Sequence, residues 1–198
     1  MKREGLIKRK TKETEIGIRF YLDGQGKSHI DCGVPFLDHM LTLFTRHGLF
    51  DLDLKARGDL EVDEHHTVED CGLALGEALS KALGDKVGLR RFGYAYAPMD
   101  ETLARVCLDL SGRPNFFFRT EKRAVPSTRT DRNFRLIKEF LKAFSVKAGM
   151  TLHIDIIIEG EDMHHVAEAV FKALGLALDQ ATVIDKRAKD IPSTKGTL

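Results

Sequence analysis

Hydrophobic and polar positions along the chain follow two different periods, and the same order of periods occurs twice. Apolar residues recur at helical spacing over 36–47 and again over 133–146. Each of these stretches is followed by a segment of alternating or β-branched residues, Leu49–Ala56 and Thr151–Ile158. The pattern therefore predicts a helix and then a strand in each half of the chain.

Two further segments repeat in sequence as well as in pattern. Residues 65–79 and 164–178 align without a gap and are identical at eight of fifteen positions. Each contains His-His-x-x-Glu, and each follows a Gly-acidic pair, at 58–59 and at 160–161. Agreement in register between two stretches of one chain indicates an internal duplication.

Each half also opens with strand-like sequence, Ile16–Leu22 in the first and Leu103–Leu110 with Phe116–Phe118 in the second. Two amphipathic helices in each half must bury their apolar faces against a partner. We therefore expect an α+β fold of two duplicated half-domains, with the four helices packed together between two sheets.

The duplication also sets the expected domain boundaries. We place the first half-domain at 1–90 and the second at 91–185. Residues 186–198 form a C-terminal tail, because the end of the chain is polar and contains Gly and Pro without an apolar stripe.

Charge and cysteine usage exclude several classes of protein. The chain carries 31 basic and 30 acidic residues, so no whole-molecule field favours nucleic acid or a membrane surface as a partner. Its three cysteines form no C-x-x-C pair, the amino terminus shows no apolar leader, and no run of 18 apolar residues occurs. We expect a cytoplasmic protein in which an anion is bound by a few neighbouring residues rather than attracted by the overall charge.

The repeated motif has the spacing of a metal site. On a helix, positions i and i+4 share a face, so His65 with Glu69, and His164 with Glu168, each present an imidazole and a carboxylate to one ion. The adjacent His66 and His165 point about 100° away, so each helix is expected to contact two ions. Imidazole with carboxylate suits Mn, Fe, Co or Zn, and the absence of nearby cysteine favours a catalytic site.

The remaining histidines carry weaker signals. His39, near the start of a predicted helix, is a candidate third ligand, although a helix-surface histidine has the same pattern. His47 precedes Gly48 and suits the carboxyl end of a helix. His153 lies in an apolar strand and is expected to be a structural residue, and His29 is expected to be solvated.

Four motifs together resemble the imidazoleglycerol-phosphate dehydratase family. They are Gly33-Val-Pro-Phe-Leu-Asp-His39-Met40, the stretch 63–70 around the first His-His, the second His-His-x-x-Glu, and the ending Pro-Ser-Thr-Lys-Gly at 192–196. The resemblance runs from about Glu13 to Lys195. It implies two half-domains, each a mixed four-stranded sheet with two helices, two manganese ions per active site, and sites shared between subunits of a 24-subunit shell.

The resemblance also implies which residues hold the metal ions. The matching positions are His39, His65, His66, Glu69, His164, His165 and Glu168. Where many members carry a histidine in a V-E-H-F-F stretch, this chain has Glu139, the counterpart of His39 in the repeat. Our hypothesis is that each ion takes ligands from both repeats. The first ion would be held by His65, Glu69, His165 and Glu139. The second, pseudo-symmetric ion would be held by His164, Glu168, His66 and His39.

The implied activity is a hydro-lyase reaction of histidine biosynthesis, in which imidazole glycerol phosphate loses water to give imidazole acetol phosphate through a metal-stabilised imidazolate. Glu13 is implied as the acid/base that contacts the substrate, and the histidines at 39, 65 and 164 as the catalytic ligands. The implied substrate-phosphate contacts are Arg91, Arg113, Ser193, Thr194 and Lys195, whose guanidinium, hydroxyl and ammonium donors suit a phosphate.

Two other functions are compatible with the same residues. A two-metal hydrolase would use the ions to generate a nucleophilic hydroxide. A metal-storing shell would bind the ions without turnover. Formation of product from imidazole glycerol phosphate, without hydrolysis of phosphate esters, separates these possibilities.

Overall fold

The protein is described here by a computed structural model, which covers residues 2–120 and 129–198 and gives the backbone alone for 129–132. The first half contains β1 (Glu4–Lys10), β2 (Thr14–Tyr21), β3 (Ser28–Asp31), α1 (Pro35–Gly48), β4 (Asp51–Gly58) and α2 (His65–Leu83). The second half contains β5 (Phe92–Met99), β6 (Thr102–Asp109), β7 (Asn115–Arg119), α3 (Arg129–Ala148), β8 (Thr151–Ile158) and α4 (Met163–Thr182).

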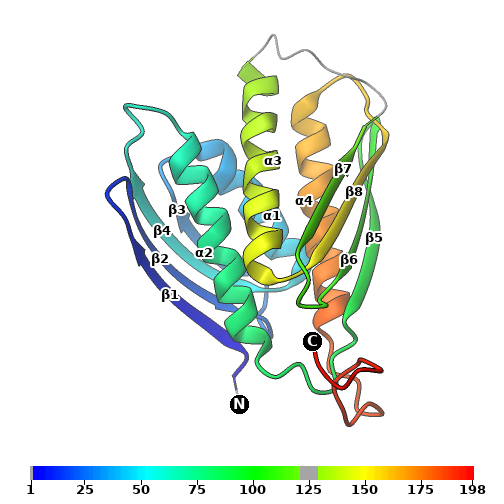
Figure 1. Cartoon of the computed structure of the whole chain (residues 1–198). Helices are drawn as coiled ribbons and strands as arrows, with labels where there is room; N and C mark the ends of the chain where they lie inside the picture. Colours follow the sequence, from blue (N-terminus) through cyan, green and yellow to red (C-terminus); the bar gives the residue numbers. More distant parts are fainter. Residues whose placement is uncertain (1, 121–128) are drawn as a thin grey trace.

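Two four-stranded sheets form the outer layers, and the helices lie between them (Figure 1). The strand orders are β1-β2-β4-β3 and β5-β6-β8-β7, so the two halves have the same topology. In each sheet the pairs are antiparallel except the last, β3 with β4 and β7 with β8, which are parallel. The predicted α+β fold, with mixed sheets and duplicated half-domains, is confirmed.

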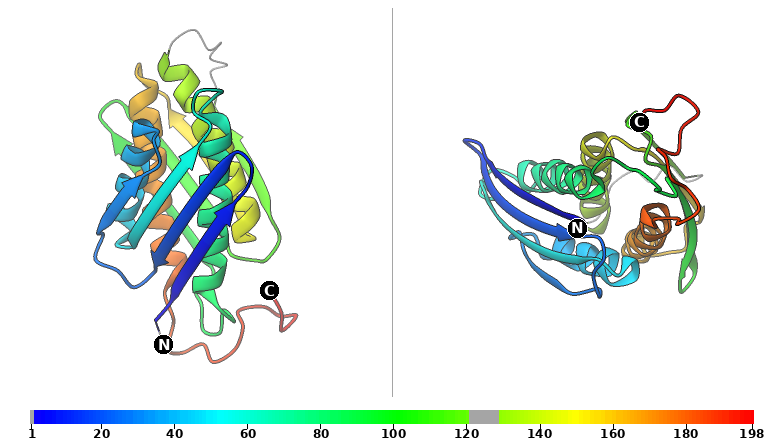
Figure 2. Two further views of the ribbon diagram at one scale, coloured as in Figure 1. Left: turned by 90° about the vertical axis from the view of Figure 1, so that its left-hand side faces the viewer. Right: turned by 90° about the horizontal axis from the view of Figure 1, so that it is seen from below.

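The helices of one half pack on the helices of the other. Helix α1 contacts α4, and α2 contacts α3, as the view along the helices shows (Figure 2). Helix α2 also covers β1 and β2, while α4 covers β5 and β6. The buried apolar side chains consequently form one continuous cluster that includes residues from both halves.

The repeated glycines explain how closely these helices approach. A Cβ added at Gly175 of α4 would lie 2.5 Å from the carbonyl oxygen of Phe44 in α1. A Cβ added at Gly76 of α2 would lie 2.5 Å from the carbonyl oxygen of Phe144 in α3. The two crossings are therefore related by the pseudo-symmetry, and each brings two helix backbones together.

Glycine has the same role where a strand meets a helix. A Cβ at Gly5 of β1 would lie 1.9 Å from the carbonyl oxygen of Ala78, and one at Gly93 of β5 would lie 1.8 Å from that of Ala177. The shared Ala-Leu-Gly-x-Ala-Leu of the two repeats is thus the surface on which a helix and a strand both pack closely. Packing against two neighbours accounts for the small residues.

Three strands, β1, β3 and β5, were not predicted from the pattern of the sequence. β1 places Leu6 outward with 60% of its surface exposed, which weakens the alternation, and β3 has only four residues. β5 contains Pro98, which an edge strand tolerates. The other strands and the four helices occur where expected, with bounds shifted by a few residues. In the part of the chain that the structure describes, no helix has the length and apolar content to span a bilayer.

Candidate metal centres and phosphate pocket

Three of the predicted ligands converge at the start of α4, and we call them the α4 cluster: His39, His164 and Glu168. The Nε2 atoms of His39 and His164 lie 3.0 and 3.1 Å from the same Glu168 oxygen, Oε1. Ligand atoms of all three residues lie within 4.8 Å of one another. Neighbouring ligands of an octahedral ion with bonds of about 2.2 Å are about 3.1 Å apart, so this spacing fits a transition metal.

Glu168 is kept ionised although most of it is buried. Burial favours its neutral form, but hydrogen bonds from Lys172 and His39 outweigh this and lower the pKa of Glu168 to about 2. The Lys172 ammonium donates to Oε2 at 2.8 Å, which leaves Oε1 facing the two imidazoles. Lys172 follows Glu168 by one helical turn, so this contact was visible as an i,i+4 pair in the sequence but was not predicted.

The first repeat presents the corresponding pair on α2. His65 Nε2 lies 3.5 Å from Glu69 Oε2, and both side chains are roughly half exposed. Glu139, half-buried on α3, is placed by the helix crossings as the counterpart of His39, because Phe44 and Phe144 occupy equivalent contacts 100 residues apart. Each of the two hypothesised ligand sets contains one of these His/Glu pairs, either the pair on α2 or the pair on α4.

His66 and His165 face away from these pairs, toward the ends of the sheets. His66 Nδ1 lies 3.0 Å from an oxygen of Asp59, whose hydrogen bond raises the pKa of His66. His165 Nδ1 lies 2.9 Å from an oxygen of Glu101, and that hydrogen bond raises the pKa of His165. Within one chain, neither histidine joins the ligand set to which we assigned it.

Glu13, the implied acid/base, lies near the first of these histidines. One of its carboxylate oxygens is 4.0 Å from His66 Nδ1, and 55% of its side chain is exposed. A carboxylate that is accessible and close to a proposed metal ligand is suited to exchange protons with a bound substrate.

The predicted phosphate residues share one pocket of about 620 Å³. Its lining includes Arg91, Arg113 and the tail residues Asp190, Ile191, Pro192, Ser193, Thr194 and Lys195. The Arg91 guanidinium pairs with both oxygens of Asp109 at 2.6 and 3.0 Å, and its Nη1 donates to the Pro192 carbonyl at 2.8 Å. Three of its five N–H donors are thus used, and the other two have no partner among the described residues and can bind an anion.

The pocket and the α4 cluster lie at opposite ends of the same helix. The Arg91 backbone N–H bonds to the carbonyl of Ala181 in the last turn of α4, whereas His164 is in the first turn. Seventeen residues (181 − 164) at 1.5 Å per residue separate them by about 26 Å. Figure 1 shows the tail at the lower end of the molecule and the starts of α2 and α4 at the upper end. No small substrate spans this distance.

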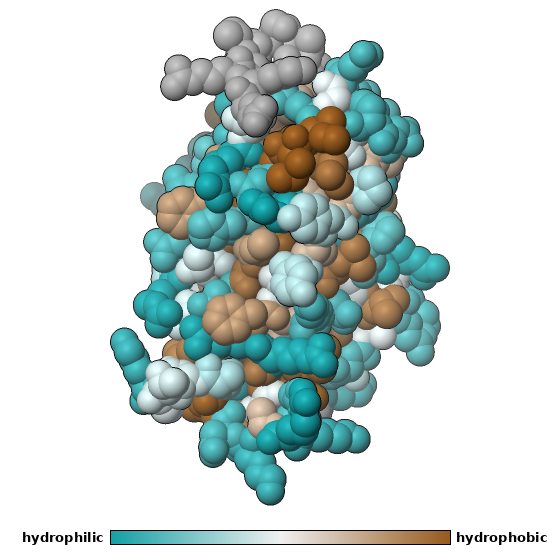
Figure 3. All heavy atoms as spheres, turned by 90° about the vertical axis from the view of Figure 1, so that its right-hand side faces the viewer, coloured by the Kyte–Doolittle hydropathy of each residue, from teal (hydrophilic) through white to brown (hydrophobic). Residues whose placement is uncertain are grey.

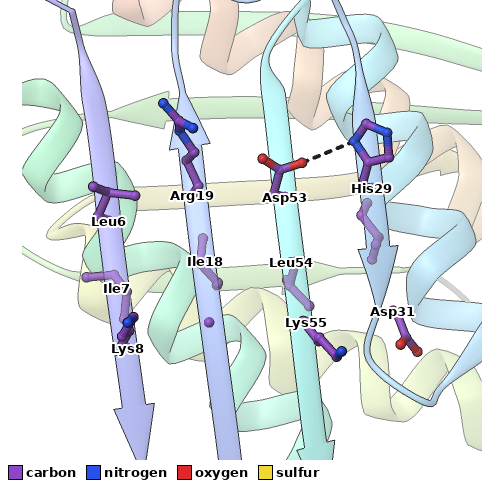
Figure 4. Close-up of a pocket in the computed structure, with 12 residues that line it drawn as sticks. Leu6, Ile7, Lys8, Ile18, Arg19, His29, Asp31, Asp53, Leu54 and Lys55 are labelled. Atoms are coloured by element: carbon purple, nitrogen blue, oxygen red, sulfur yellow. Dashed lines mark hydrogen bonds and ion pairs between the residues drawn. The ribbon is translucent and has the colours of Figure 1, made fainter.

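The outer faces of the two sheets differ in chemistry. A cavity of about 970 Å³ lies on the outer face of the first sheet, where charges of both signs alternate and His29 Nδ1 is 3.1 Å from Asp53 (Figure 4). The second sheet has three exposed aromatic residues, Tyr94, Tyr96 and Phe117. The side of the molecule that Figure 3 shows mixes apolar and polar groups. Neither face holds a predicted metal ligand.

The other histidines occupy the environments expected of them. His29 has 85% of its side chain exposed. His153 stacks on Phe117, with ring centroids 4.5 Å apart. His47 is in the last turn of α1, where burial and then the nearby Lys172 charge lower its pKa.

Known proteins match this chain along its length. The family model for imidazoleglycerol-phosphate dehydratase matches residues 32–178. The imidazoleglycerol-phosphate dehydratase of Geobacillus sp. (strain WCH70) is 54% identical over 199 residues and 100% of both chains. That of Syntrophobacter fumaroxidans (strain DSM 10017 / MPOB) is 52% identical over 100% of this chain and 98% of its own.

Solved structures give the same result for the fold. The imidazoleglycerol-phosphate dehydratase of Staphylococcus aureus subsp. aureus N315 superposes with a TM-score of 0.77 at 40% identity, over 91% of this chain and 99% of that one. The IGPD of Pyrococcus furiosus, solved in complex with (S)-C348, gives a TM-score of 0.79 at 36% identity, over 97% and 100%. Sequence and fold agree, and the chain belongs to the imidazoleglycerol-phosphate dehydratase family.

Proposed function

We propose that the protein is a hydro-lyase of histidine biosynthesis that converts imidazole glycerol phosphate to imidazole acetol phosphate with two Mn²⁺ ions per active site. The observation that supports this function best is the α4 cluster, in which two imidazoles and a carboxylate from distant parts of the chain converge at the spacing of metal ligands. Membership of the family supports the substrate and the reaction.

The active site is proposed to be assembled from more than one chain. His66 and His165 face away from the helix pairs of their own chain, and the phosphate pocket is about 26 Å from the α4 cluster. A neighbouring copy that supplies these groups would complete the two ligand sets and bring a phosphate to the ions. The exposed aromatic residues of the second sheet support association, for which the family resemblance implies 24 subunits.

The residues divide the chemistry between them. Bound Mn²⁺ would supply Lewis acidity toward the leaving hydroxyl and stabilise charge on the imidazole ring. The two free donors of Arg91, with Arg113, Ser193, Thr194 and Lys195, would hold the phosphate and fix the position of the reacting carbons. Glu13 would take the proton from carbon as base and return it to the departing hydroxyl as acid, so that the hydroxyl leaves as water while the electrons of the broken C–H bond form the new double bond.

The test is turnover of purified protein loaded with Mn²⁺ and given imidazole glycerol phosphate. We expect the enol or ketone product to appear in the absorbance spectrum and to disappear after treatment with a chelator. Release of inorganic phosphate without this product would indicate a two-metal hydrolase. Stoichiometric Mn²⁺ binding with neither product would indicate metal storage.

A further inference from the structure

His66 and His165 each form a hydrogen bond through Nδ1 to a carboxylate that sequence patterns did not identify. In the first repeat the partner is Asp59, in the turn after β4, with distances of 3.0 and 3.3 Å to its two oxygens. In the second it is Glu101, immediately before β6, with distances of 2.9 and 3.2 Å. Both histidines therefore have the same ring nitrogen engaged.

The two carboxylates come from positions that are not equivalent in the duplication. Glu101 precedes the buried Thr102 at the start of its strand, as Glu13 precedes the buried Thr14, so Glu101 is the repeat counterpart of Glu13. Asp59 follows Gly58, and its counterpart is Glu161 after Gly160. The same contact with histidine is thus made by different elements of the two halves.

As a result, the two counterpart glutamates, Glu13 and Glu101, make different contacts. The Oε1 atom of Glu101 accepts the backbone N–H groups of Glu161 at 3.1 Å and Asp162 at 3.3 Å, so this carboxylate is fixed at the end of its sheet. The Glu13 carboxylate lies 4.0 Å from His66, because Asp59 already occupies Nδ1. Asp59 therefore leaves Glu13 available to a substrate, whereas Glu101 is engaged in structure.

A carboxylate at Nδ1 determines which nitrogen of the ring can bind a metal. An ionised carboxylate accepts a hydrogen bond, so Nδ1 carries the proton and Nε2 keeps its lone pair. In His165 the free Nε2 lies on the side of Asp100, whose nearest oxygen is 3.9 Å away. Such carboxylate–histidine pairs fix the tautomer and the orientation of metal-ligating imidazoles.

We propose that Asp59 and Glu101 are positioning residues that hold His66 and His165 with Nε2 presented to the metal ions of the active site. The inference rests on the proposed metal binding by these two histidines and adds the groups that orient them. It assigns to Glu101 a role different from that of Glu13, its counterpart in the repeat.

The structure predicts different results for the two amide substitutions. In Glu101→Gln, the backbone N–H groups of Glu161 and Asp162 require the amide oxygen at the Oε1 position. The NH₂ group then takes the Oε2 position, which is the nearer of the two to Nδ1, at 2.9 against 3.2 Å. A donor at Nδ1 favours the wrong tautomer and removes the lone pair from Nε2. In Asp59→Asn, no pair of backbone donors from the described residues fixes the amide, so its oxygen can turn to His66.

The experiment is a titration of each metal-free protein with Mn²⁺, in which electron paramagnetic resonance of the free ion gives dissociation constants and the number of ions bound. His165→Ala is measured first, to establish that His165 is a ligand. We expect Glu101→Gln to weaken Mn²⁺ binding at one class of site by about 10- to 100-fold, with an unchanged number of ions at saturation. Asp59→Asn should have a smaller effect.

Glu161→Gln is the matched control, because it removes a charge from the same turn while its exposed side chain leaves the backbone N–H to Glu101 intact. Its Mn²⁺ affinity should equal that of the unmodified protein. Thermal melting of each metal-free variant shows whether the fold is retained, and Glu101→Ala provides a second substitution at the same position.

Three results have distinct meanings. Full Mn²⁺ affinity in Glu101→Gln and Glu101→Ala would overturn the positioning role. Loss of a bound ion in both Glu101→Gln and Asp100→Asn would also overturn it, because these residues would then ligate a cation themselves, as their spacing with His165 allows. Unchanged binding in His165→Ala would instead refute the proposed ligand set.

Discussion

The substitution Gly175→Ala tests whether the packing of α1 on α4 sets the geometry of the α4 cluster. The added Cβ would lie 2.5 Å from the Phe44 carbonyl oxygen and 3.0 Å from the Gly48 backbone nitrogen. Both obstacles are backbone atoms, so no side-chain rotation relieves the clash. Ordinary contact begins at 3.4 Å, so the helices must separate locally by about 0.9 Å (3.4 − 2.5).

Two opposing effects determine how much Gly175→Ala changes the free energy of unfolding. Alanine favours the helix over glycine by about 1 kcal/mol. Overpacking of a close-packed interface costs about 1–3 kcal/mol, and a clash with backbone belongs at the upper end of that range. The net destabilisation is about 2 kcal/mol, which corresponds to a decrease in Tm of about 4–8 °C for a chain of this size.

The same displacement should reach the proposed metal ligands. His39 is on α1, and its Nε2 atom is 3.0 Å from Glu168 on α4, so a separation of about 0.9 Å lengthens that contact beyond hydrogen-bonding distance. We therefore expect Gly175→Ala to weaken Mn²⁺ binding as well as to lower stability. Gly76→Ala should have the corresponding effect through α2 and α3.

Chemical denaturation and thermal melting of the chelated protein measure the stability, and a Mn²⁺ titration measures the binding. Gly17→Ala on β2 is the control, because a Cβ there has no neighbour within 4 Å and should leave both quantities nearly unchanged. If Gly175→Ala were as stable as the unmodified protein and bound Mn²⁺ equally well, close helix contact would not determine the site.

Three further predictions concern the metal and the tail. Deletion of Pro192–Leu198 should raise KM and lower kcat, while Mn²⁺ content and assembly are retained. Each lost phosphate contact of roughly 1.5–3 kcal/mol should lower kcat/KM by about ten- to 150-fold. A chelator should abolish activity and convert the assembly to smaller species in size-exclusion chromatography, because ligands shared between chains link metal binding to association. Lys172→Met removes the donor that lowers the pKa of Glu168, so protons should displace Mn²⁺ at a higher pH in an acid titration followed by electron paramagnetic resonance.

Each of these predictions has an opposite outcome. Unchanged KM and kcat after the deletion would show that the tail does not bind phosphate. An inactive assembly of unchanged size after chelation would show that metal does not hold the chains together. Mn²⁺ release at an unchanged pH in Lys172→Met would show that Lys172 does not control the ionisation of Glu168.

The sequence by itself determined the duplication, the four helices and the residue types of the proposed metal site. Helical spacing placed His164 and Glu168 on one face. Because the same motif recurs at 65–69, this spacing of His and Glu is not a chance occurrence. Strands were predicted where alternation was strong. They were missed in β1, β3 and β5, where the strand was short or an apolar residue faced outward.

Tertiary structure alone decided which of these groups meet. His39 reaches Glu168 across 129 positions of sequence, and Glu101 reaches His165 across 64. It also placed the proposed phosphate pocket at the far end of α4 from His164. Local periodicity depends on interactions within a few residues, whereas these contacts depend on how helices and sheets from both halves pack. The two repeats share a motif, yet His66 contacts Asp59 and His165 contacts Glu101, so packing distinguishes the repeats.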